Sequence, residues 1–278
     1  VGQNWGFPTY NWKKMQEDGF ARWKKRFRQM SAYFDAFRID HILGFFRIWS
    51  IPIDAVQGIM GRFVPCLPVH INEFGEKGIW FDYQRFCRPF ITDEVLSEIF
   101  NEDAEQVKTN YLAPNEFGGY DLLPEFDTQK KLEAHFEQLT GCENAPKLRA
   151  GLYDLVSNVI LFEEEGSEGQ EFHFRISMEK TSSFRHLIPH VQEKLKDLCV
   201  NYFFRRQDDF WFREAMHKLP QLKEATNMLV CGEDLGMVPD CVPEVMQQLG
   251  ILSLEIQRMP KDPQKEFFHP NDAPYLSV

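Results

Sequence analysis

The sequence predicts an α/β fold, part of a (βα)8 TIM-type barrel that carries a large and mostly helical insertion. Short apolar segments typical of strands end at residues 39, 231 and 257, and helical patterns precede two of them, as in parallel βα units. Acidic side chains follow the first two segments, and such a barrel keeps its active site at the carboxyl ends of its strands. The chain between the two acidic positions is far longer than a βα loop requires, which predicts the insertion.

The first elements are a helix and a strand. Over residues 12–34, large apolar side chains such as Phe20 and Phe27 recur at three- and four-residue steps, which predicts one amphipathic helix. A strand follows and ends at Ile39. In the loop after it, Phe45, Phe46 and Trp49 are expected in the core rather than at a sugar-binding surface, because large apolar side chains are usually buried.

Residues 66–90 combine proline, glycine and aromatic residues without a helical period, so we expect a long irregular loop there. Thr92 then provides an N-cap for a helix over 93–100. The further elements expected are a helix over 129–139 capped by Asp127 or Thr128 and ended by Gly141, a half-buried strand over 170–177, helices over 187–206 and 208–218, a strand over 228–231, a helix from Pro243 to Gly250, and a strand from Leu252 to Gln257.

These elements divide the chain into three parts. Residues 1–79 are expected to be a barrel segment with the first acidic strand, and residues 206–278 a barrel segment with the second. Residues 80–205 are expected to form the helical insertion outside the barrel wall, because capped helical patterns fill that interval.

The first acidic position is Asp40, at the end of its strand. Arg38 lies two residues earlier and therefore points to the same face, where its charge keeps the carboxylate ionised. An ionised carboxylate at a rigid strand end is what a covalent carboxylate nucleophile requires. Taken alone, an Arg-x-Asp pattern is more often a structural ion pair in a core.

The second acidic position is Glu233 with Asp234, inside the motif Gly232–Gly236. Two strand ends that each present a carboxylate are the layout used to cleave glycosidic bonds. The negative charge of Asp234 favours a protonated Glu233, as a general acid requires. The two glycines lack the lysine of a phosphate-binding loop and the dinucleotide fingerprint, so no nucleotide and no other cofactor is expected.

Composition excludes several classes of partner. The net charge of −11 argues against nucleic acid and against an anionic membrane surface, and no apolar run is long enough to span a bilayer. A neutral substrate fits better. The six cysteines form no C-x-x-C pair and have no histidine at ligand spacing, so neither a metal site nor a disulfide framework is expected, and a cytoplasmic location is the default.

Three motifs, in this order, carry a resemblance to a known family. They are Gly2-Gln3-Asn4-Trp5-Gly6-Phe7-Pro8-Thr9-Tyr10, Arg38-Ile39-Asp40-His41 with Gly44-Phe45, and Gly232-Glu233-Asp234-Leu235-Gly236. Together they resemble the 4-α-glucanotransferases, or amylomaltases, glycoside hydrolase family 77 of the α-amylase clan. The insertion and the segment Glu255–Pro260 are similar to the longer subfamily that includes the plant cytosolic disproportionating enzyme and related bacterial proteins.

The resemblance implies roles for named residues. Asp40 would be the nucleophile and Glu233 the general acid/base, with Arg38 positioning and ionising Asp40. Trp5 would stack on sugar rings, and His41 and Asp234 would hydrogen-bond sugar hydroxyls. The substrates would be malto-oligosaccharides and α-glucan polymers, transferred with retention of configuration and without a cofactor or metal.

One feature departs from the family pattern. The family has a third catalytic aspartate in a later His-Asp motif, and this chain ends at Val278 before such a motif. The chain therefore resembles an internal segment of a family member. We expect such a segment to have weak activity on its own. Two other functions stay open. One is a retaining α-glucan hydrolase of the same clan, and the other is a glucan-binding segment without catalysis.

Overall fold

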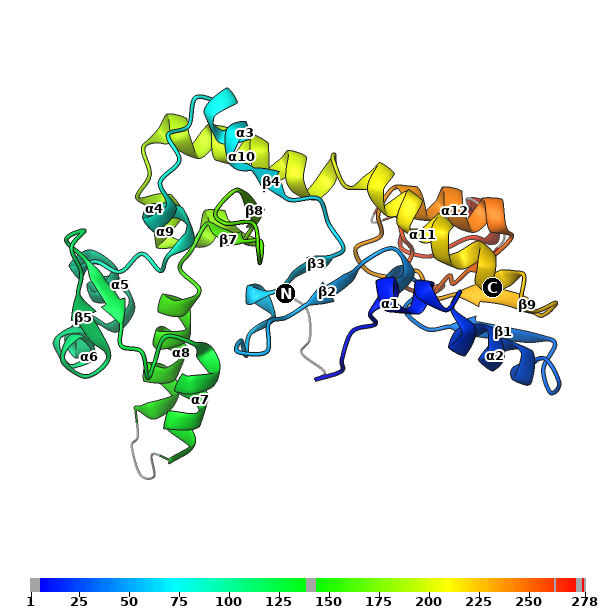
Figure 1. Ribbon diagram of the computed structural model, residues 1–278, viewed down its shortest axis with the longest axis horizontal. Coiled ribbons are helices and arrows are strands. Elements are labelled where there is room, and N and C mark those ends of the chain that lie inside the picture. Colours follow the sequence, from blue (N-terminus) through cyan, green and yellow to red (C-terminus); the bar gives the residue numbers. More distant parts are fainter. Residues whose placement is uncertain (1–5, 139–143, 263, 274–276, 278) are drawn as a thin grey trace. The chain divides into compact units, whose positions relative to one another are not determined.

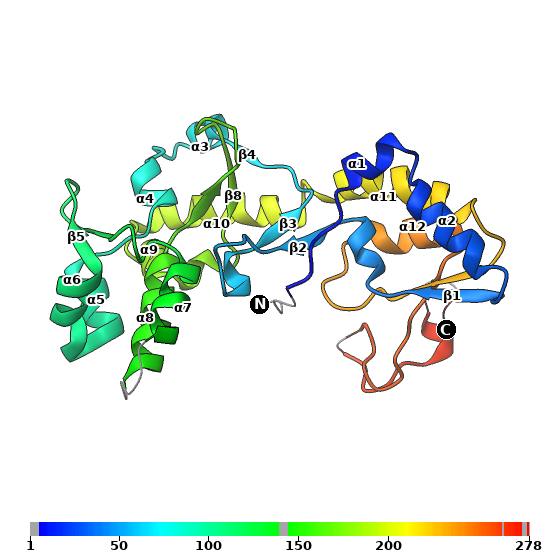
Figure 2. The ribbon, with the colours of Figure 1, turned by 60° about the horizontal axis from the view of Figure 1, so that its bottom comes forward.

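The computed structural model describes residues 6–138, 144–262, 264–273 and 277, and the chain divides into two compact units. The helical unit comprises residues 49–62 and 68–202 with Gly6 and Phe7, and the parallel-sheet unit comprises residues 8–48, 63–67 and those from 203 onward. Figures 1 and 2 show the elements of both units. Among the described residues, no helix combines the length and apolar character needed to cross a membrane.

The parallel-sheet unit is built on a sheet of order β1-β9-β10, in which β9 pairs with both neighbours in parallel. The helices α2, α11 and α12 lie on one side of β1 in Figure 2. The elements of this unit are α1 (Trp12–Glu17), α2 (Ala21–Met30), β1 (Ala36–Ile39), η1 (Ile42–Phe45), α11 (Asp208–Lys223), β9 (Leu229–Gly232), α12 (Cys241–Leu249), β10 (Leu252–Ser253) and η5 (Pro270–Asp272).

The predicted α/β class with parallel strands is confirmed for this unit, and a closed barrel is not seen among the described residues. Phe45 and Phe46 are buried, as predicted, whereas Trp49 is only half-buried. Gly232 at the end of β9 allows the side chains of Ile42 and Met246 to pack against the backbone. A Cβ at this position would lie 2.7 Å from Ile42 Cδ1 and 2.9 Å from Met246 Cε.

The single helix predicted over residues 12–34 is wrong, because the chain forms α1 and α2 with a break between them. Gly19 and Phe20 both have left-handed backbone angles, with φ of 63° and 60°. Their N–H groups donate back to the Gln16 and Met15 carbonyls, which is the arrangement that ends a helix at a glycine. The new helix begins where the Ala21 N–H donates to the Asp18 side chain.

The C-terminal elements differ from the prediction in length. The predicted helix over 208–218 extends as α11 to Lys223, with Pro220 inside it. The last strand ends at Ser253 rather than Gln257, and the chain then turns, with the Met259 N–H donating to the Ile256 carbonyl. The helix that ends at Gly250 is confirmed, because Gly250 follows α12 with a left-handed φ of 58°.

The helical unit has a core of packed helices and small antiparallel sheets. The buried faces of α5, α6, α7 and α8 form one apolar cluster. The short sheets have the orders β4-β8-β7 and β5-β6. The elements are β2 (Ile48–Ser50), η2 (Gly58–Met60), β3 (Arg62–Val64), β4 (Val69–His70), α3 (Ile71–Glu76), α4 (Tyr83–Cys87), α5 (Asp93–Phe100), η3 (Asn101–Asp103), α6 (Ala104–Tyr111), β5 (Leu112–Pro114), β6 (Tyr120–Leu122), α7 (Gln129–Gln138), α8 (Ala145–Val156), β7 (Leu161–Glu163), β8 (Glu171–Phe174), η4 (Met178–Lys180), α9 (Ser182–Arg185) and α10 (Pro189–Phe204).

Several predicted caps are present in this unit. The Thr92 hydroxyl accepts from Val95 N–H at the start of α5, and the Thr128 hydroxyl accepts from Lys131 N–H at the start of α7. Gly141 lies outside the described residues. The irregular loop predicted for 66–90 is wrong, because β4, α3 and α4 form there around buried aromatic rings such as Phe74 and Phe86.

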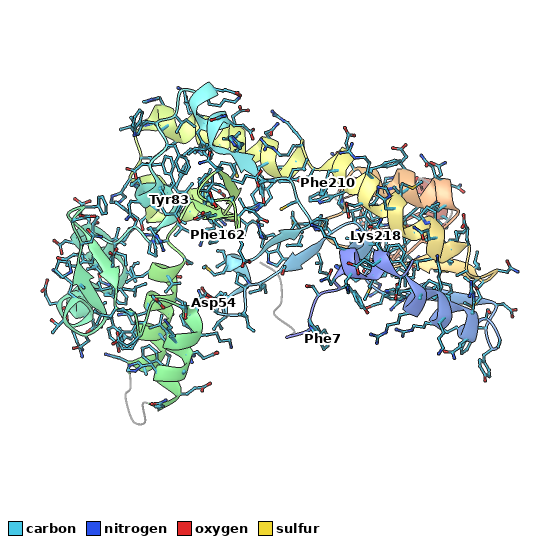
Figure 3. All side chains as sticks on the ribbon, in the orientation of Figure 1. Phe7, Asp54, Tyr83, Phe162, Phe210 and Lys218 are labelled. Carbon is cyan, nitrogen blue, oxygen red and sulfur yellow. The ribbon has the colours of Figure 1, made fainter. Side chains whose placement is uncertain are left out.

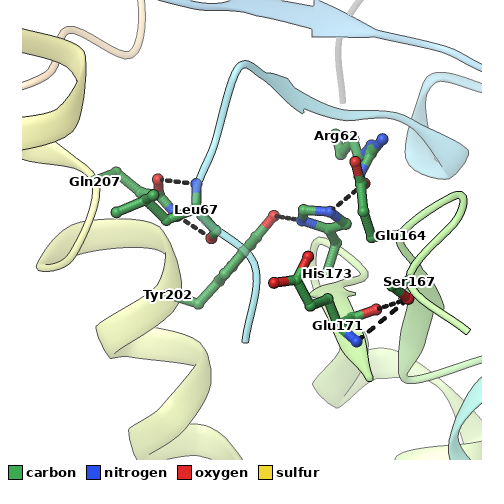
Figure 4. Close-up of polar contacts among 8 residues, drawn as sticks. All are labelled: Arg62, Leu67, Glu164, Ser167, Glu171, His173, Tyr202 and Gln207. Carbon is green, nitrogen blue, oxygen red and sulfur yellow. Dashed lines mark hydrogen bonds and ion pairs between the residues drawn. The ribbon is translucent and has the colours of Figure 1, made fainter. Parts of the chain in front are cut away.

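A buried histidine connects β8 with α10 in the helical unit (Figure 4). His173 Nε2 lies 2.7 Å from the Glu164 carboxylate, and its Nδ1 lies 2.9 Å from the Tyr202 hydroxyl. Arg62 pairs with the same Glu164 oxygen. Burial and the Arg62 charge lower the pKa of His173 to about 4, although Glu164 acts in the opposite direction. The ring is therefore neutral at pH 7, with its proton on the nitrogen that faces Glu164.

A second contact in Figure 4 belongs to the parallel-sheet unit. The buried side chain of Gln207 accepts from Leu67 N–H at 2.8 Å and donates to Leu67 C=O at 2.9 Å. Trp211 Nε1 donates to the Pro65 carbonyl at 2.8 Å nearby. These bonds hold the chain that precedes residues 68–202 next to the chain that follows them.

Candidate active site

The register of β1 and β9 brings the two predicted carboxylates to neighbouring positions. Ile39 and Gly232 are the last paired residues of the two strands, and Asp40 and Glu233 follow them directly. The pairing continues past the strands, because Glu233 N–H donates to the Ile39 carbonyl at 2.9 Å and Ile42 N–H donates to the Glu233 carbonyl at 3.0 Å. Two residues far apart in the sequence therefore leave the sheet side by side.

The Glu233 side chain is held by the turn that follows Asp40. Its Oε2 accepts from the His41 N–H at 2.7 Å. His41 has a left-handed φ of 49°, the conformation with which the chain turns from β1 into η1. Glu233 is a half-buried residue, and its carboxyl group has a fixed direction because a main-chain donor one residue from Asp40 holds it.

Asp40 forms the ion pair that the sequence predicts. Arg38 Nη2 donates to Asp40 Oδ1 at 2.7 Å, and both side chains are exposed. An exposed pair of this kind adds about 0 to 1 kcal/mol to stability. Its main consequence is therefore orientation, because the guanidinium fixes one oxygen of a carboxylate that is otherwise open to solvent.

Asp234 occupies a different environment from the one that the predicted contact with sugar hydroxyls suggests. It is buried, 1% exposed, beside β10. Its carboxylate accepts from Ser253 Oγ at 2.7 Å, from Leu254 N–H at 3.0 Å and from Lys261 Nζ at 2.8 Å. These protein groups occupy hydrogen-bonding positions of the Asp234 carboxylate. A role of Asp234 in binding sugar hydroxyls stays a prediction.

His41 and Trp5 are the remaining predicted site residues, and the structure describes only His41. His41 is exposed at the turn between Asp40 and η1, so its imidazole lies on the same strand end as the nucleophile candidate. Its role in binding stays a prediction. Trp5 lies outside the described residues.

Two buried cations support the site, and sequence reasoning missed both. The Arg47 guanidinium lies 3.6 Å from the Phe63 ring centroid and 4.9 Å from that of Trp211, and it donates to the Met237 carbonyl. It therefore joins the segment after Asp40 to the loop after Glu233. Burial lowers the pKa of Arg47 to about 10, which leaves it charged at neutral pH.

Lys218 lies on α11 (Figure 3) and supports the chain that follows Asp40. Its ammonium donates to the Phe45 carbonyl at 3.0 Å and pairs with Glu214 at 2.9 Å. Burial lowers the pKa of Lys218. The sequence offers no signal for this role, because a lysine on an amphipathic helix is usually solvated.

The described residues contain no group of three or more His, Cys, Asp or Glu side chains placed to hold a metal ion. The two carboxylates of the candidate site differ in environment: Asp40 is exposed and paired with an arginine, and Glu233 is half-buried and held by a main-chain N–H.

Comparisons with known proteins agree with one another. The family model described as 4-alpha-glucanotransferase, glycoside hydrolase family 77, matches residues 1–278. A 4-alpha-glucanotransferase DPE2 of Oryza sativa is 41% identical over 281 residues, which cover 100% of this chain and 30% of that protein. A 4-alpha-glucanotransferase of Aquifex aeolicus is 30% identical over 178 residues, which cover 62% of this chain and 35% of that protein.

A shorter match is to the chloroplastic/amyloplastic 4-alpha-glucanotransferase of Solanum tuberosum, 45% identical over 62 residues, which cover 22% of this chain and 11% of that protein. The chain thus spans about a third or less of the length of these relatives. No solved structure matches it significantly.

Proposed function

The chain belongs to the 4-alpha-glucanotransferase family, glycoside hydrolase family 77, and on this premise we propose that it carries the nucleophile and the general acid/base of a retaining α-1,4-glucan transferase. The single observation that supports the assignment most strongly is the placement of Asp40 and Glu233 after the last register pair of β1 and β9. Neighbouring strands lie about 4.8 Å apart, and the carboxyl groups of retaining enzymes lie about 5 to 5.5 Å apart.

In the proposed fold, the sheet β1-β9-β10 is part of a (βα)8 barrel, and residues 80–205 form an insertion outside its wall. The parallel pairing supports this assignment, as does the position of both carboxylates at the carboxyl ends of strands. The strands β5 to β8 pair only in antiparallel fashion among the described residues, which is unlike barrel strands.

The proposed reaction proceeds by two displacements. Asp40 attacks the anomeric carbon of the donor glucan while Glu233 gives its proton to the glycosidic oxygen, so the C–O bond breaks and a glucosyl ester of Asp40 forms. Glu233 then takes the proton of an acceptor 4-hydroxyl, which attacks the same carbon and releases Asp40. Two inversions leave the configuration unchanged.

The proposed substrates are malto-oligosaccharides and α-glucan polymers, with His41, Asp234 and Trp5 as further candidates for contacts to the sugars. The names of the relatives support this substrate class. The net charge of −11 suits a neutral polymer better than nucleic acid or an anionic membrane. We place the enzyme in the cytoplasm, because the described cysteines are free thiols, which a reducing compartment maintains.

The test is to replace each carboxylate in the complete enzyme. Asp40→Asn and Glu233→Gln should each lower maltotriose disproportionation by at least about a thousandfold, with little change in the melting temperature. The matched control is Asp35→Asn, at the opposite end of β1, which should keep its activity. Full activity in either catalytic variant would contradict the assignment.

The same assay separates transfer from hydrolysis. A transferase converts maltotriose into longer glucans and glucose, whereas a retaining hydrolase of the same clan yields only shorter sugars. A covalent glucosyl group found on Asp40 after trapping with an activated fluorosugar donor would support either enzyme. It would exclude a segment that only binds glucan.

A further inference from the structure

The helix α2 has a positively charged surface in a chain that is acidic as a whole. Residues 13–28 contain seven lysines and arginines and two acidic residues, a net charge of +5, whereas the net charge of the chain is −11. Arg22, Lys25, Arg26 and Arg28 are exposed on α2, and none of them pairs with a carboxylate among the described residues. Their charges are therefore not compensated within the described structure.

Helical geometry gathers these cations on one face. Arg22 and Arg26 are one turn apart, where the side chains of a helix are neighbours. The buried Phe27 marks the face that is turned to the core, and the half-buried Trp23 lies between the two faces. Like charges one turn apart destabilise a helix, so an anion bound between the two guanidinium groups would remove a repulsion.

Aromatic contacts give part of this surface a fixed geometry. The Arg26 guanidinium lies 5.7 Å from the Trp23 ring centroid. The centroid of the Tyr10 ring is 5.5 Å from that of Trp23 and 5.3 Å from that of Trp12, and Tyr10 is 51% exposed. The two tryptophans thus hold Tyr10 in place while about half of it stays open to solvent. An open aromatic ring beside polar groups is suited to the apolar face of a sugar.

The N-terminal half of α2 lies at the catalytic end of β1. The Trp23 ring centroid is 5.6 Å from that of Phe45, which ends the short helix η1 after Asp40. Later in α2, Phe27 contacts Phe37 of β1, with centroids 4.7 Å apart. The helix therefore runs back along the strand, and its first turns are at the end where Asp40 is. A polymer that extends from Asp40 can reach this surface.

Three classes of anionic ligand can bind a basic helix face, and one of them fits this face best. A membrane-binding helix inserts its apolar face, but the apolar face of α2 packs against Phe37 and Phe45. A nucleic acid presents many negative charges to a chain whose net charge is −11, and the two repel each other. A single phosphate group on a neutral polymer avoids both conflicts, and two guanidinium groups match its charge of nearly −2.

We propose that Arg22 and Arg26 bind a phosphate monoester carried by an α-glucan, and that Tyr10 stacks on a glucose unit next to it. The inference rests on the proposed function for the glucan, whereas the preference for phosphate follows from the arginines. It adds phosphorylated α-glucans to the neutral substrates proposed above. Each planar guanidinium can donate to two phosphate oxygens at once, which a lysine cannot do.

The experiment measures by calorimetry how tightly the complete enzyme binds maltoheptaose with and without one 6-phosphate group. Every sample carries Asp40→Asn to prevent turnover. The phosphorylated form should bind about five- to tenfold more tightly, the order expected for two exposed charge pairs. Arg22→Gln and Arg26→Gln should each remove much of this preference, and Arg22→Lys should keep only part of it, because its ammonium lacks the planar fork.

Two further variants make the comparison specific. Arg28→Gln is the matched control, because it removes the same charge from another exposed position of α2, about a third of the way round the helix, and it should keep the preference. Tyr10→Ala should weaken the binding of both oligosaccharides alike, since stacking does not involve the phosphate. Added inorganic phosphate or salt should lower the preference. Melting temperatures show that each variant is folded.

The outcomes separate this inference from the proposed function. If the two oligosaccharides bind equally, or if Arg28→Gln lowers the preference as much as Arg22→Gln, the inference is wrong. Tighter binding of a DNA duplex or of phosphatidylserine vesicles through the same arginines would also overturn the choice of ligand. A preference that depends on Arg22 and Arg26, in an enzyme whose unchanged form has no transferase activity, would overturn the proposed function and support the phosphate site.

Discussion

At the scale of single residues, His173 links protein stability to pH. The ordinary pKa of 6.5 applies in the unfolded chain, whereas the folded pKa is about 4, because burial disfavours the charged ring. Between these values the unfolded chain binds more protons than the folded one, so stability is complete above about pH 6.5 and is lost as the pH falls toward 4. The expected loss is on the order of 3 kcal/mol.

The measurement is urea unfolding of the native chain and of His173→Gln between pH 7 and pH 4.5. The variant should lose much of the pH dependence in this range, since its amide does not titrate. His190→Gln, on the exposed surface of α10, is the control and should unfold like the native chain at every pH. Equal slopes in all three proteins would show that His173 does not carry the effect.

Single residues also show which parts of the site the sequence can predict. Asp40 and Glu233 could be selected as candidates, and their neighbouring positions expected, because each follows an apolar strand pattern within a recognisable motif. The partners of Asp234 could not, because Ser253 and Lys261 approach it only through the pairing of β9 with β10 and the turn after β10. A lysine in a proline-containing tail gives no sign in the sequence that it is paired with a buried carboxylate.

At the scale of elements, two helical glycines should respond in opposite ways to alanine. Gly151 on α8 packs against Phe100, and a Cβ there would lie 2.8 Å from the buried ring's Cζ. Gly75 on α3 has nothing within 4 Å of its Cβ position. We therefore expect Gly151→Ala to lower the free energy of unfolding by about 1 to 3 kcal/mol, and Gly75→Ala to raise it by about 0.5 to 1 kcal/mol.

Chemical denaturation of the two variants tests this contrast, and each is the other's control, because both make the same substitution in a helix. A stabilised Gly151→Ala would mean that α8 shifts to accommodate the methyl group. A destabilised Gly75→Ala would mean that helix propensity is not the dominant effect on α3.

Local signals explain why some elements could be predicted and others could not. Thr92 and Gly250 mark helix ends by their own chemistry, and both predictions are confirmed. The break between α1 and α2 also has a local signal in Gly19, but the regular apolar spacing on both sides favoured one helix. The elements β4, α3 and α4 depend on aromatic packing with β8, which no local pattern records.

At the scale of the whole chain, the contact of Gln207 with Leu67 predicts that residues 68–202 can be removed. Because the two hydrogen bonds hold the flanking chain together within the parallel-sheet unit, a short Gly/Ser linker can join Leu67 to Phe203. Loop closure depends only weakly on loop length, so this unit should keep its fold in the shortened enzyme. Thermal unfolding and turnover of α-glucosyl fluoride, a small activated donor, provide the measurements.

The same shortened enzyme with Gln207→Ala is the comparison. It should melt at a lower temperature, since the linker then lacks the bonds that position its ends. If the shortened enzyme is unfolded even with Gln207 intact, the parallel-sheet unit depends on residues 68–202 for its stability. The neighbouring positions of β1 and β9 were predictable from their motifs, whereas this contact between flanking segments was not.

Because β1 and β9 are far apart in the sequence, β1 is synthesised well before the strand with which it pairs. His41 and Glu233, which bond to each other, are 192 residues apart. At synthesis rates of about 5 to 20 residues per second, the ribosome adds the partner strand roughly 10 to 40 s after the first. During this interval the newly made β1 is an unpaired strand edge, open to other nascent chains. Asp35, Arg38 and Asp40 place charges in and beside this short strand, and charged side chains on an edge disfavour pairing with other chains.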